Sequence, residues 1–182
     1  CALPIYKLKV SWKVVPAAAS YQVYRSTKKD GDYQNIKTID SVGTSSWTDS
    51  SVKTGKTYYY KIKVVVKTQN GNQTSGFSNV KSAKAVPAKT TLKAKASNAK
   101  NVKLTWSKVK GANGYEIYRS NSKDGKYQKV KTISKGGTTS YKDGKLKKST
   151  TYYYKIRAYR KVDRKKVYGS YSSVVSVKTK AK

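Results

Sequence analysis

The sequence predicts an all-β protein made of two tandem β-sandwiches, and three observations lead to this prediction. The chain repeats itself without a gap, so that Trp12 recurs 94 positions later as Trp106. Within each copy, apolar residues alternate with lysines, which is the period of two of a half-buried strand. Glycine-containing turn pairs separate the alternating segments. The repeat therefore predicts two domains, residues 1–85 and 86–182, each with its own core.

Three segments of the first copy have strand periodicity. The first contains Leu8, Val10 and Trp12, which alternate with lysine and serine. The next is 21–26, and the longest is 58–64, in which tyrosine and aliphatic side chains point one way and lysines the other. Asp30-Gly31 and Asn70-Gly71 tolerate the positive φ angles of tight hairpins, so they are expected to join strands.

The second copy repeats these segments at 102–106, 115–120 and 152–158, and it carries one strand more. Residues 88–97, with Leu92, Ala94 and Ala96, should form a first strand whose counterpart would begin before residue 1. The first copy is therefore expected to lack most of its first strand. Two explanations are open: the chain was excised from a longer array and has an open edge, or a strand from a neighbouring chain fills the gap and self-assembly follows.

Three features of this pattern carry a family resemblance. They are a Trp on the second strand, a Tyr-x-Val/Ile-Tyr third strand, and a Tyr six residues after an apolar residue, as in Val52 to Tyr58. This combination resembles the fibronectin type III domain, an immunoglobulin-like β-sandwich. The resemblance implies that Trp12 and Trp106 are core residues. It also implies that Tyr58 and Tyr152 are corner tyrosines, whose hydroxyls bond to the chain just upstream.

The amino-acid sequence of the repeats is similar to that of tandem repeats in surface and secreted proteins of Gram-positive anaerobic bacteria. The relevant segments are Gly-Tyr-Glu-Ile-Tyr-Arg-Ser at 114–120 and Thr-Tyr-Tyr-Tyr-Lys-Ile-Arg-Ala-Tyr at 151–159. The resemblance implies an extracellular or cell-surface location and a non-catalytic structural or adhesive role, as a spacer or fibre-forming segment beside other domains of a longer parent chain. Cys1 is either the lipid-modified first residue of a lipoprotein or an arbitrary cut.

The chain is strongly basic, with 41 Lys and Arg residues against 8 Asp and Glu and a formal net charge of +33. Lysines protect sheet edges from aggregation, and they also attract anionic cell-wall polymers or glycans. A specific nucleic-acid partner is not expected, because no nucleic-acid-binding motif is present. The candidate polyanion contact is a basic cluster in the loop before the last strand, made of Arg160, Lys161, Arg164, Lys165 and Lys166.

The sequence predicts no catalysis and no cofactor or metal site. It contains no His, and its acids are mostly scattered at turns. Asp30 and Asp32 flank a hairpin glycine, while Asp49 and Asp143 recur at matching positions and are expected to cap turns. No segment approaches the roughly 20 apolar residues of a membrane helix, so no membrane span is predicted.

Overall fold

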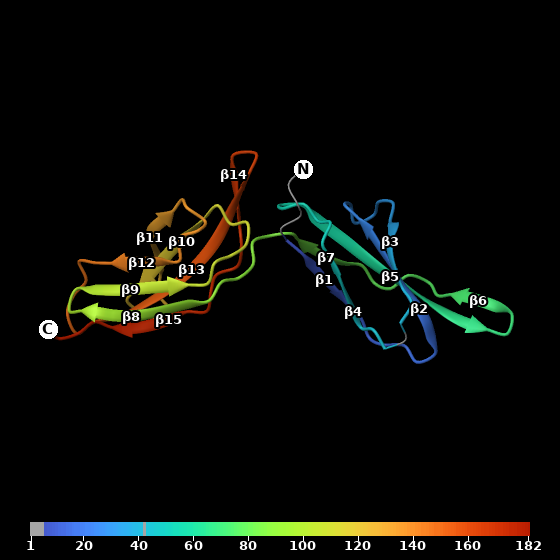
Figure 1. Cartoon of the computed structure of the whole chain (residues 1–182), viewed down its shortest axis with the longest axis horizontal. Helices are drawn as coiled ribbons and strands as arrows, with labels where there is room; N and C mark the ends of the chain where they lie inside the picture. Colours follow the sequence, from blue (N-terminus) through green and yellow to red (C-terminus); the bar gives the residue numbers. More distant parts are fainter. Residues whose placement is uncertain (1–5, 42) are drawn as a thin grey trace. The chain divides into compact units, whose positions relative to one another are not determined.

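The computed structural model describes residues 6–41 and 43–182 and confirms the all-β fold in these ranges. The chain divides into two compact units, which we call module 1 (Cys1–Ala85) and module 2 (Val86–Lys182). Each module contains two antiparallel sheets that enclose an apolar core (Figure 1). No helix in the described ranges has the length and apolar character needed to cross a membrane.

Module 1 has a small sheet and a large sheet. The small sheet pairs β1 (Leu8–Ser11) with β4 (Ser46–Asp49). The large sheet has the order β3-β2-β5-β6, and β7 also pairs with β5. The strands of the large sheet are β2 (Ala18–Ser26), β3 (Gln34–Ile39), β5 (Thr57–Thr68), β6 (Gly71–Thr74) and β7 (Lys81–Lys84).

Among the described residues, module 2 has the same arrangement with one more strand in its small sheet. Its small sheet has the order β12-β9-β8, and its large sheet has the order β11-β10-β13-β14, with β15 also on β13. The small-sheet strands are β8 (Leu92–Asn98), β9 (Asn101–Trp106) and β12 (Ser140–Asp143). The large-sheet strands are β10 (Gly114–Ser120), β11 (Gln128–Ile133), β13 (Thr151–Val162), β14 (Lys165–Tyr168) and β15 (Val175–Lys178).

The alternation in the sequence explains which face of each long strand is buried. In β13, Tyr152, Tyr154 and Ile156 enter the core, while Tyr153 and Lys155 point outward and are half-buried. The equivalent strand β5 has the same pattern over its first half. Because successive side chains of a strand point to opposite faces, a segment of this kind places one row in the core and the other on the outer face.

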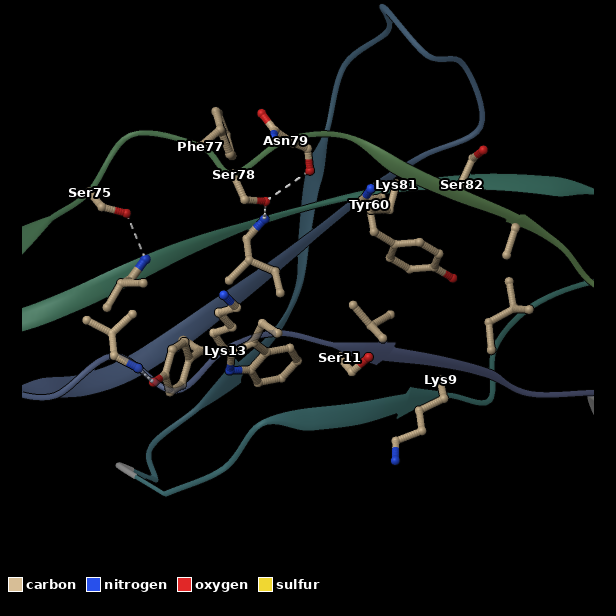
Figure 2. Close-up of a pocket in the computed structure, with 18 of the residues that line it drawn as sticks. Lys9, Ser11, Lys13, Tyr60, Ser75, Phe77, Ser78, Asn79, Lys81 and Ser82 are labelled. Carbon is tan, nitrogen blue, oxygen red and sulfur yellow. Dashed lines mark hydrogen bonds between the residues drawn. The ribbon is translucent and has the colours of Figure 1, made fainter.

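The two small sheets differ among the described residues; the counterpart of β8 in module 1 would fall at or before residue 4, outside those residues. In module 2, β8 pairs with β9 and covers the edge of the core, and Leu92 of β8 is buried. In module 1, β4 is the only strand among the described residues that pairs with β1. An apolar groove therefore opens beside β1, and Figure 2 shows part of its lining. Cys1 lies outside the described residues.

The basic segment 160–166 belongs to a β-hairpin and not to a loop, so the sequence analysis was wrong on this point. Strands β13 and β14 continue to Val162 and Lys165, which face each other across the hairpin. The turn consists of Asp163 and Arg164, both with positive φ, at 48° and 64°. Positive φ at both central residues defines the type I′ turn, whose twist matches that of paired strands.

Candidate binding surfaces and buried ion pairs

A buried ion pair recurs in both modules and links the small sheet to the large sheet. In module 1, Arg25 Nη1 lies 2.7 Å from Asp49 Oδ2, and the Tyr60 hydroxyl donates to the same oxygen at 2.8 Å. Asp49 also accepts from the backbone N–H of Ser51, so it caps a turn as the sequence predicted. The carboxylate therefore joins strands β2, β4 and β5.

Module 2 repeats the arrangement with its own residues. Arg119 Nη1 lies 2.8 Å from Asp143 Oδ2, and the Tyr154 hydroxyl donates to that oxygen at 2.8 Å. Both carboxylates are almost completely buried, whereas the arginines keep about a quarter of their side-chain surface in contact with solvent. An acid held in this way is a structural link, because its acceptor sites are already occupied.

Burial and hydrogen bonding have opposite effects on the pKa of Asp49. Desolvation by itself would raise the pKa of Asp49, but the hydrogen bonds from Ser51, Arg25 and Tyr60 outweigh it and the pKa is lowered. The same contact raises the pKa of Tyr60 through burial and through its bond to the carboxylate. Asp49 therefore stays ionised and cannot carry a proton at neutral pH.

The corner tyrosines have the geometry that the resemblance implied. The Tyr58 hydroxyl accepts a hydrogen bond from Lys53 N at 2.9 Å, and the Tyr152 hydroxyl accepts one from Lys147 N at 3.0 Å. Trp106 is buried in the core of module 2. Trp12 packs against the core of module 1 but remains partly exposed, because it lines the open groove.

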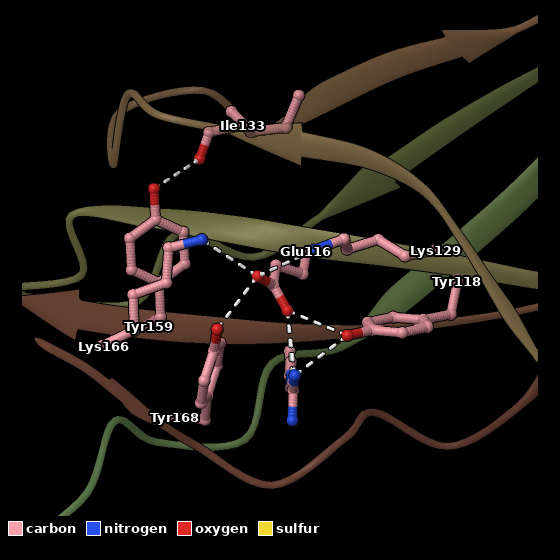
Figure 3. Close-up of polar contacts among 8 residues, drawn as sticks. Glu116, Tyr118, Lys129, Ile133, Tyr159, Lys166 and Tyr168 are labelled. Carbon is pink, nitrogen blue, oxygen red and sulfur yellow. Dashed lines mark hydrogen bonds and ion pairs between the residues drawn. The ribbon is translucent and has the colours of Figure 1, made fainter.

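A third buried acid, Glu116, forms a network that occurs in module 2 alone within the described ranges. Its side chain is 1% exposed and points to the outer face of the large sheet. Arg157 and the Tyr118 hydroxyl approach one carboxylate oxygen at 2.9 Å, while Lys166 and the Tyr168 hydroxyl approach the other at 3.0 and 3.1 Å (Figure 3). Lys129 lies 3.6 Å away.

These donors keep Glu116 charged. Desolvation by burial would raise its pKa, but hydrogen bonds from Arg157, Lys166 and the two tyrosines lower the pKa to about 2. The counterparts in module 1 are Gln22, Lys63 and Asn72, which cannot form such a cluster of charges. The network therefore links β10, β13 and β14 in the second copy only.

The structure divides the predicted basic cluster into two groups. Lys166 pairs with Glu116, and Arg160 donates to the Gly111 carbonyl at 3.1 Å, so both help to hold the hairpin in place. Lys161, Arg164 and Lys165 are exposed near the hairpin turn. Only this second group, which we call the hairpin-tip cations, presents free charge to a ligand.

Cationic and aromatic side chains alternate over the outer face of each large sheet. In module 1, Lys61 lies over the rings of Tyr33 and Phe77, at 4.2 and 5.1 Å. In module 2, Lys155 lies over Tyr127 and Tyr171, at 4.2 and 4.5 Å, and Arg157 follows over Tyr168 at 3.7 Å. Each contact is worth about 0.5–1 kcal/mol at an exposed site. Several of the charges are therefore already engaged within the sheet.

Sequence reasoning missed the two recurring Arg–Asp pairs and the Glu116 network. A signal for the first was present, because Arg25, Asp49 and Tyr60 all recur 94 positions later as the same residue types. In the part of the chain that the structure describes, no three side chains of His, Cys, Asp or Glu gather in a group that could hold a metal ion.

Comparison with known proteins gives one relative by sequence and several by structure. No family model matches the chain. An amylopullulanase of Thermoanaerobacter thermohydrosulfuricus is 36% identical over 81 residues, which is 44% of this chain and 5% of the enzyme. The chain is therefore similar to a short segment of that protein.

The structural neighbours are fibronectin type III domains. The FN1–FN3 domains of chicken CNTN1 match 96% of this chain and 63% of their own, with 20% identity and a TM-score of 0.46. FN3tt matches 54% of this chain and 99% of its own, with 23% identity and a TM-score of 0.43.

Proposed function

We propose that this chain is a non-catalytic structural unit of a longer extracellular or cell-surface bacterial protein, in which it spaces other domains. The observation that carries the proposal is the use of the buried acids. Among the described residues these are Asp49, Glu116 and Asp143, and each accepts hydrogen bonds from an arginine and a tyrosine. A general acid or base needs a pKa near the working pH, whereas the pKa of Asp49 and of Glu116 is lowered.

The sequence relative supports the same proposal. Its matching segment is about one module long and makes up 5% of a much larger enzyme, which has room for its chemistry elsewhere. We therefore expect the purified chain to release no reducing sugar from pullulan. Measurable hydrolysis that survives repeated purification would contradict the non-catalytic role.

A spacer should also hold its ends at a defined separation. Fluorescent protein domains fused to the two ends would report that separation by single-molecule energy transfer. We expect one narrow distribution that does not change between low and physiological salt. A broad, salt-dependent distribution, as a flexible linker gives, would contradict the spacer role.

A second candidate function is binding of an anionic polymer, and the hairpin-tip cations are the observation that favours it. They add free charge to a molecule with a formal net charge of +33. Replacing Lys161, Arg164 and Lys165 together with glutamine should weaken binding of poly(glycerol phosphate) several-fold and flatten its salt dependence. Lys166 should be left in place, because its loss would also disturb Glu116.

The matched control removes three exposed strand lysines, Lys93, Lys95 and Lys103, from the small sheet of module 2. If the hairpin tip is the contact, this control keeps most of the affinity. An equal loss from both triple variants would mean that only net charge acts. If the affinity did not change with salt concentration, electrostatic attraction would be ruled out as the cause of binding.

A further inference from the structure

A cavity lies in module 2 where β13 begins, at the other end of that strand from the hairpin-tip cations. Its volume is about 640 Å³, within the range of roughly 300–1,000 Å³ that small-molecule sites occupy. The end of β10, the segment between β12 and β13, and the first residues of β13 form it. Among the described residues, three cations and no acid line this cavity: Arg119, Lys145 and Lys147.

Arg119 is the most firmly held of the three cations. Its Nη1 lies 2.8 Å from Asp143 Oδ2, and its guanidinium carbon lies 5.4 Å from the centre of the Tyr152 ring. The side chain nevertheless keeps 30% of its surface exposed. A guanidinium has five N–H donors, so donors remain for a ligand in the cavity. Because these contacts already fix the arginine, it loses little further conformational freedom when it binds an anion.

Module 1 uses its equivalent arginine differently. Arg25 Nη1 also bonds to Ser51 Oγ at 2.6 Å, so a serine of the same module occupies the arginine. The residue 94 positions after Ser51 is Lys145, which is exposed and has no hydroxyl to offer. Module 2 therefore has a second cation where module 1 has a neutral partner, and the cavity carries more positive charge than the single buried Asp143 neutralises.

Two residues of the cavity have backbone conformations that residues other than glycine rarely adopt. The φ angle of Lys145 is 58°, and that of Ser149 is 51°. The counterpart of Ser149 in module 1 is Gly55, which reaches a φ of 83° without a steric penalty. Strained backbone positions of this kind gather at binding sites. Ser149 therefore adds a hydroxyl to the cavity at a position that glycine would fill more easily.

Uncharged polar side chains complete the lining. Within the described ranges, the side chains of Asn121, Ser149 and Thr151 line the cavity and have no hydrogen-bond partner in the protein. An amide and two hydroxyls can both donate and accept. They can therefore bind the hydroxyl groups of a ligand without breaking a bond within module 2.

We propose that this cavity binds a phosphate monoester carried by a hydroxyl-rich molecule. Arginine and lysine make charge-assisted hydrogen bonds to phosphate oxygens, and the planar fork of Arg119 matches two of those oxygens. Three cations favour a dianion, which distinguishes a phosphate monoester from a sulfate ester or a phosphodiester. This inference concerns a site separate from the hairpin tip and does not depend on the proposed spacer role.

Glycerol phosphate is the probe, and glycerol and glycerol sulfate are its controls. At physiological ionic strength, where diffuse attraction is screened, glycerol phosphate should cause saturable shifts of the Lys145, Ser149 and Thr151 amide resonances in two-dimensional NMR spectra. Glycerol should cause none, and glycerol sulfate should bind several-fold more weakly. The amides of Ser51 and Gly55 are an internal control in module 1 and should shift little.

The second ionisation of the ligand supplies an independent check. A phosphate monoester takes up a proton with a pKa of about 6, whereas a sulfate ester does not change its charge in this range. The chain contains no His, so a change between pH 7 and 5 reports the ligand. The affinity for glycerol phosphate should fall several-fold over this interval, while that for glycerol sulfate should stay constant.

Two double variants remove the same charge from different places. Lys145→Ser introduces the residue of module 1, and together with Lys147→Gln it should weaken binding about tenfold. The control is Lys103→Gln with Lys142→Gln, which removes two lysines that face each other across β9 and β12. It should change the affinity by less than about twofold. All four lysines are exposed, so neither variant should unfold module 2.

Three results would overturn the proposal. The first is that millimolar glycerol phosphate causes no saturable shift at the cavity amides. The second is an equal loss of affinity in both double variants, because net charge alone would then attract the ligand. The third is equal binding of glycerol sulfate and glycerol phosphate at pH 7, because the cavity would then not select a dianion.

Discussion

Modules 1 and 2 share the links that hold strands together and differ in what they present to the outside. The N–O distances of the pairs Arg25–Asp49 and Arg119–Asp143 are nearly the same, 2.7 and 2.8 Å. In each pair the carboxylate also accepts a hydrogen bond from a tyrosine hydroxyl. Module 2 adds the Glu116 network and is closed by β8. Module 1 has Gln22 at the equivalent position and an open groove beside β1.

The difference shows that one framework supports two surfaces. The recurring Arg–Asp–Tyr links lie between the sheets, where all three partners must be present together because an unpaired buried charge is costly. Positions that diverge lie on the outer face of the large sheet, at the edge of the small sheet beside β1, or, like Gly114, inside a strand of the large sheet. Converting module 2 residues into their module 1 counterparts therefore measures how much each divergence contributes.

The largest effect is expected for Gly114→Ser, which introduces the residue that module 1 has at Ser20. A Cβ at Gly114 would lie 1.9 Å from the Ile133 carbonyl oxygen and 2.7 Å from the Tyr159 hydroxyl oxygen. A backbone atom cannot move aside as a flexible side chain can. We expect a loss of roughly 3 kcal/mol in the unfolding free energy of module 2, measured by hydrogen exchange of β13 amides.

The reciprocal change, Ser20→Gly, is the control. Module 1 has a register shift between Ala18 and Ser20, and Val65 stands where module 2 has Tyr159, so Ser20 fits without overlap. This variant should lose no more than about 1 kcal/mol, the usual cost of glycine within a strand. Equal losses from both changes would mean that the close approach at Gly114 is not what separates the modules.

The next largest loss of stability is expected for Glu116→Gln, which gives module 2 the neutral residue that module 1 has at Gln22. Arg157 and Lys166 would lose their carboxylate partner, and Tyr118 and Tyr168 would lose a charged acceptor. Because the cations are partly exposed, we expect a loss of roughly 2 kcal/mol at pH 7, less than for a fully buried pair. Urea unfolding followed by two-dimensional NMR would assign the loss to module 2.

The change Gln22→Glu in module 1 sharpens the same comparison. Lys63 stands in place of Arg157, and Asn72 in place of Lys166, so a carboxylate there has fewer donors. It should not stabilise module 1. A gain as large as the loss from Glu116→Gln would show that the acid alone, and not its partners, is responsible.

Lowering the pH should destabilise module 2 more than module 1, by slightly less than the loss expected from Glu116→Gln. The pKa of Glu116 is about 2 in the folded chain, below the value of about 4.3 that a glutamate has when unfolded. The unfolded state therefore binds the proton first, and stability present above pH 5 is lost as the pH falls toward 2. We expect this residue to contribute a loss of about 1.5 kcal/mol between pH 5 and 2.5, once exposure of its partners is allowed for.

The variant Glu116→Gln supplies the control for this pH dependence. In this variant the stability of module 2 should fall less as the pH is lowered. The fall in the stability of module 1 should not change, because the pKa of Asp49 is lowered in both proteins. The measurement is the urea midpoint of each module as a function of pH. If the urea midpoint of module 2 fell equally at low pH in the parent chain and in the variant, the assignment to Glu116 would be contradicted.

These comparisons also indicate what the sequence could and could not predict. The repeat and the period of two predict the strands, and the family resemblance predicts the corner tyrosines, because these depend on local pattern. The Glu116 network depends on side chains brought together from β10, β13 and β14, such as Arg157 and Lys166, which are 41 and 50 residues away. The type I′ turn was missed because Asp163 and Arg164 are not the usual Asn-Gly pair.

The smallest effect is expected for Tyr171→Phe, which places at this position the residue that module 1 has as Phe77. Tyr171 lies edge to face with Tyr118 and beneath Lys155, just as Phe77 lies against Tyr24 and Lys61. The ring makes both of these contacts, because a cation interacts with the ring quadrupole, whereas the Tyr171 hydroxyl hydrogen-bonds to the Tyr118 side chain. Because the Phe variant keeps the ring and loses only this partly exposed hydrogen bond, it should lose no more than about 1 kcal/mol. Tyr171→Leu removes the ring and should cost about 1 kcal/mol more. Equal unfolding midpoints for the Phe and Leu variants would mean that the alternating cations and rings add nothing beyond apolar contact.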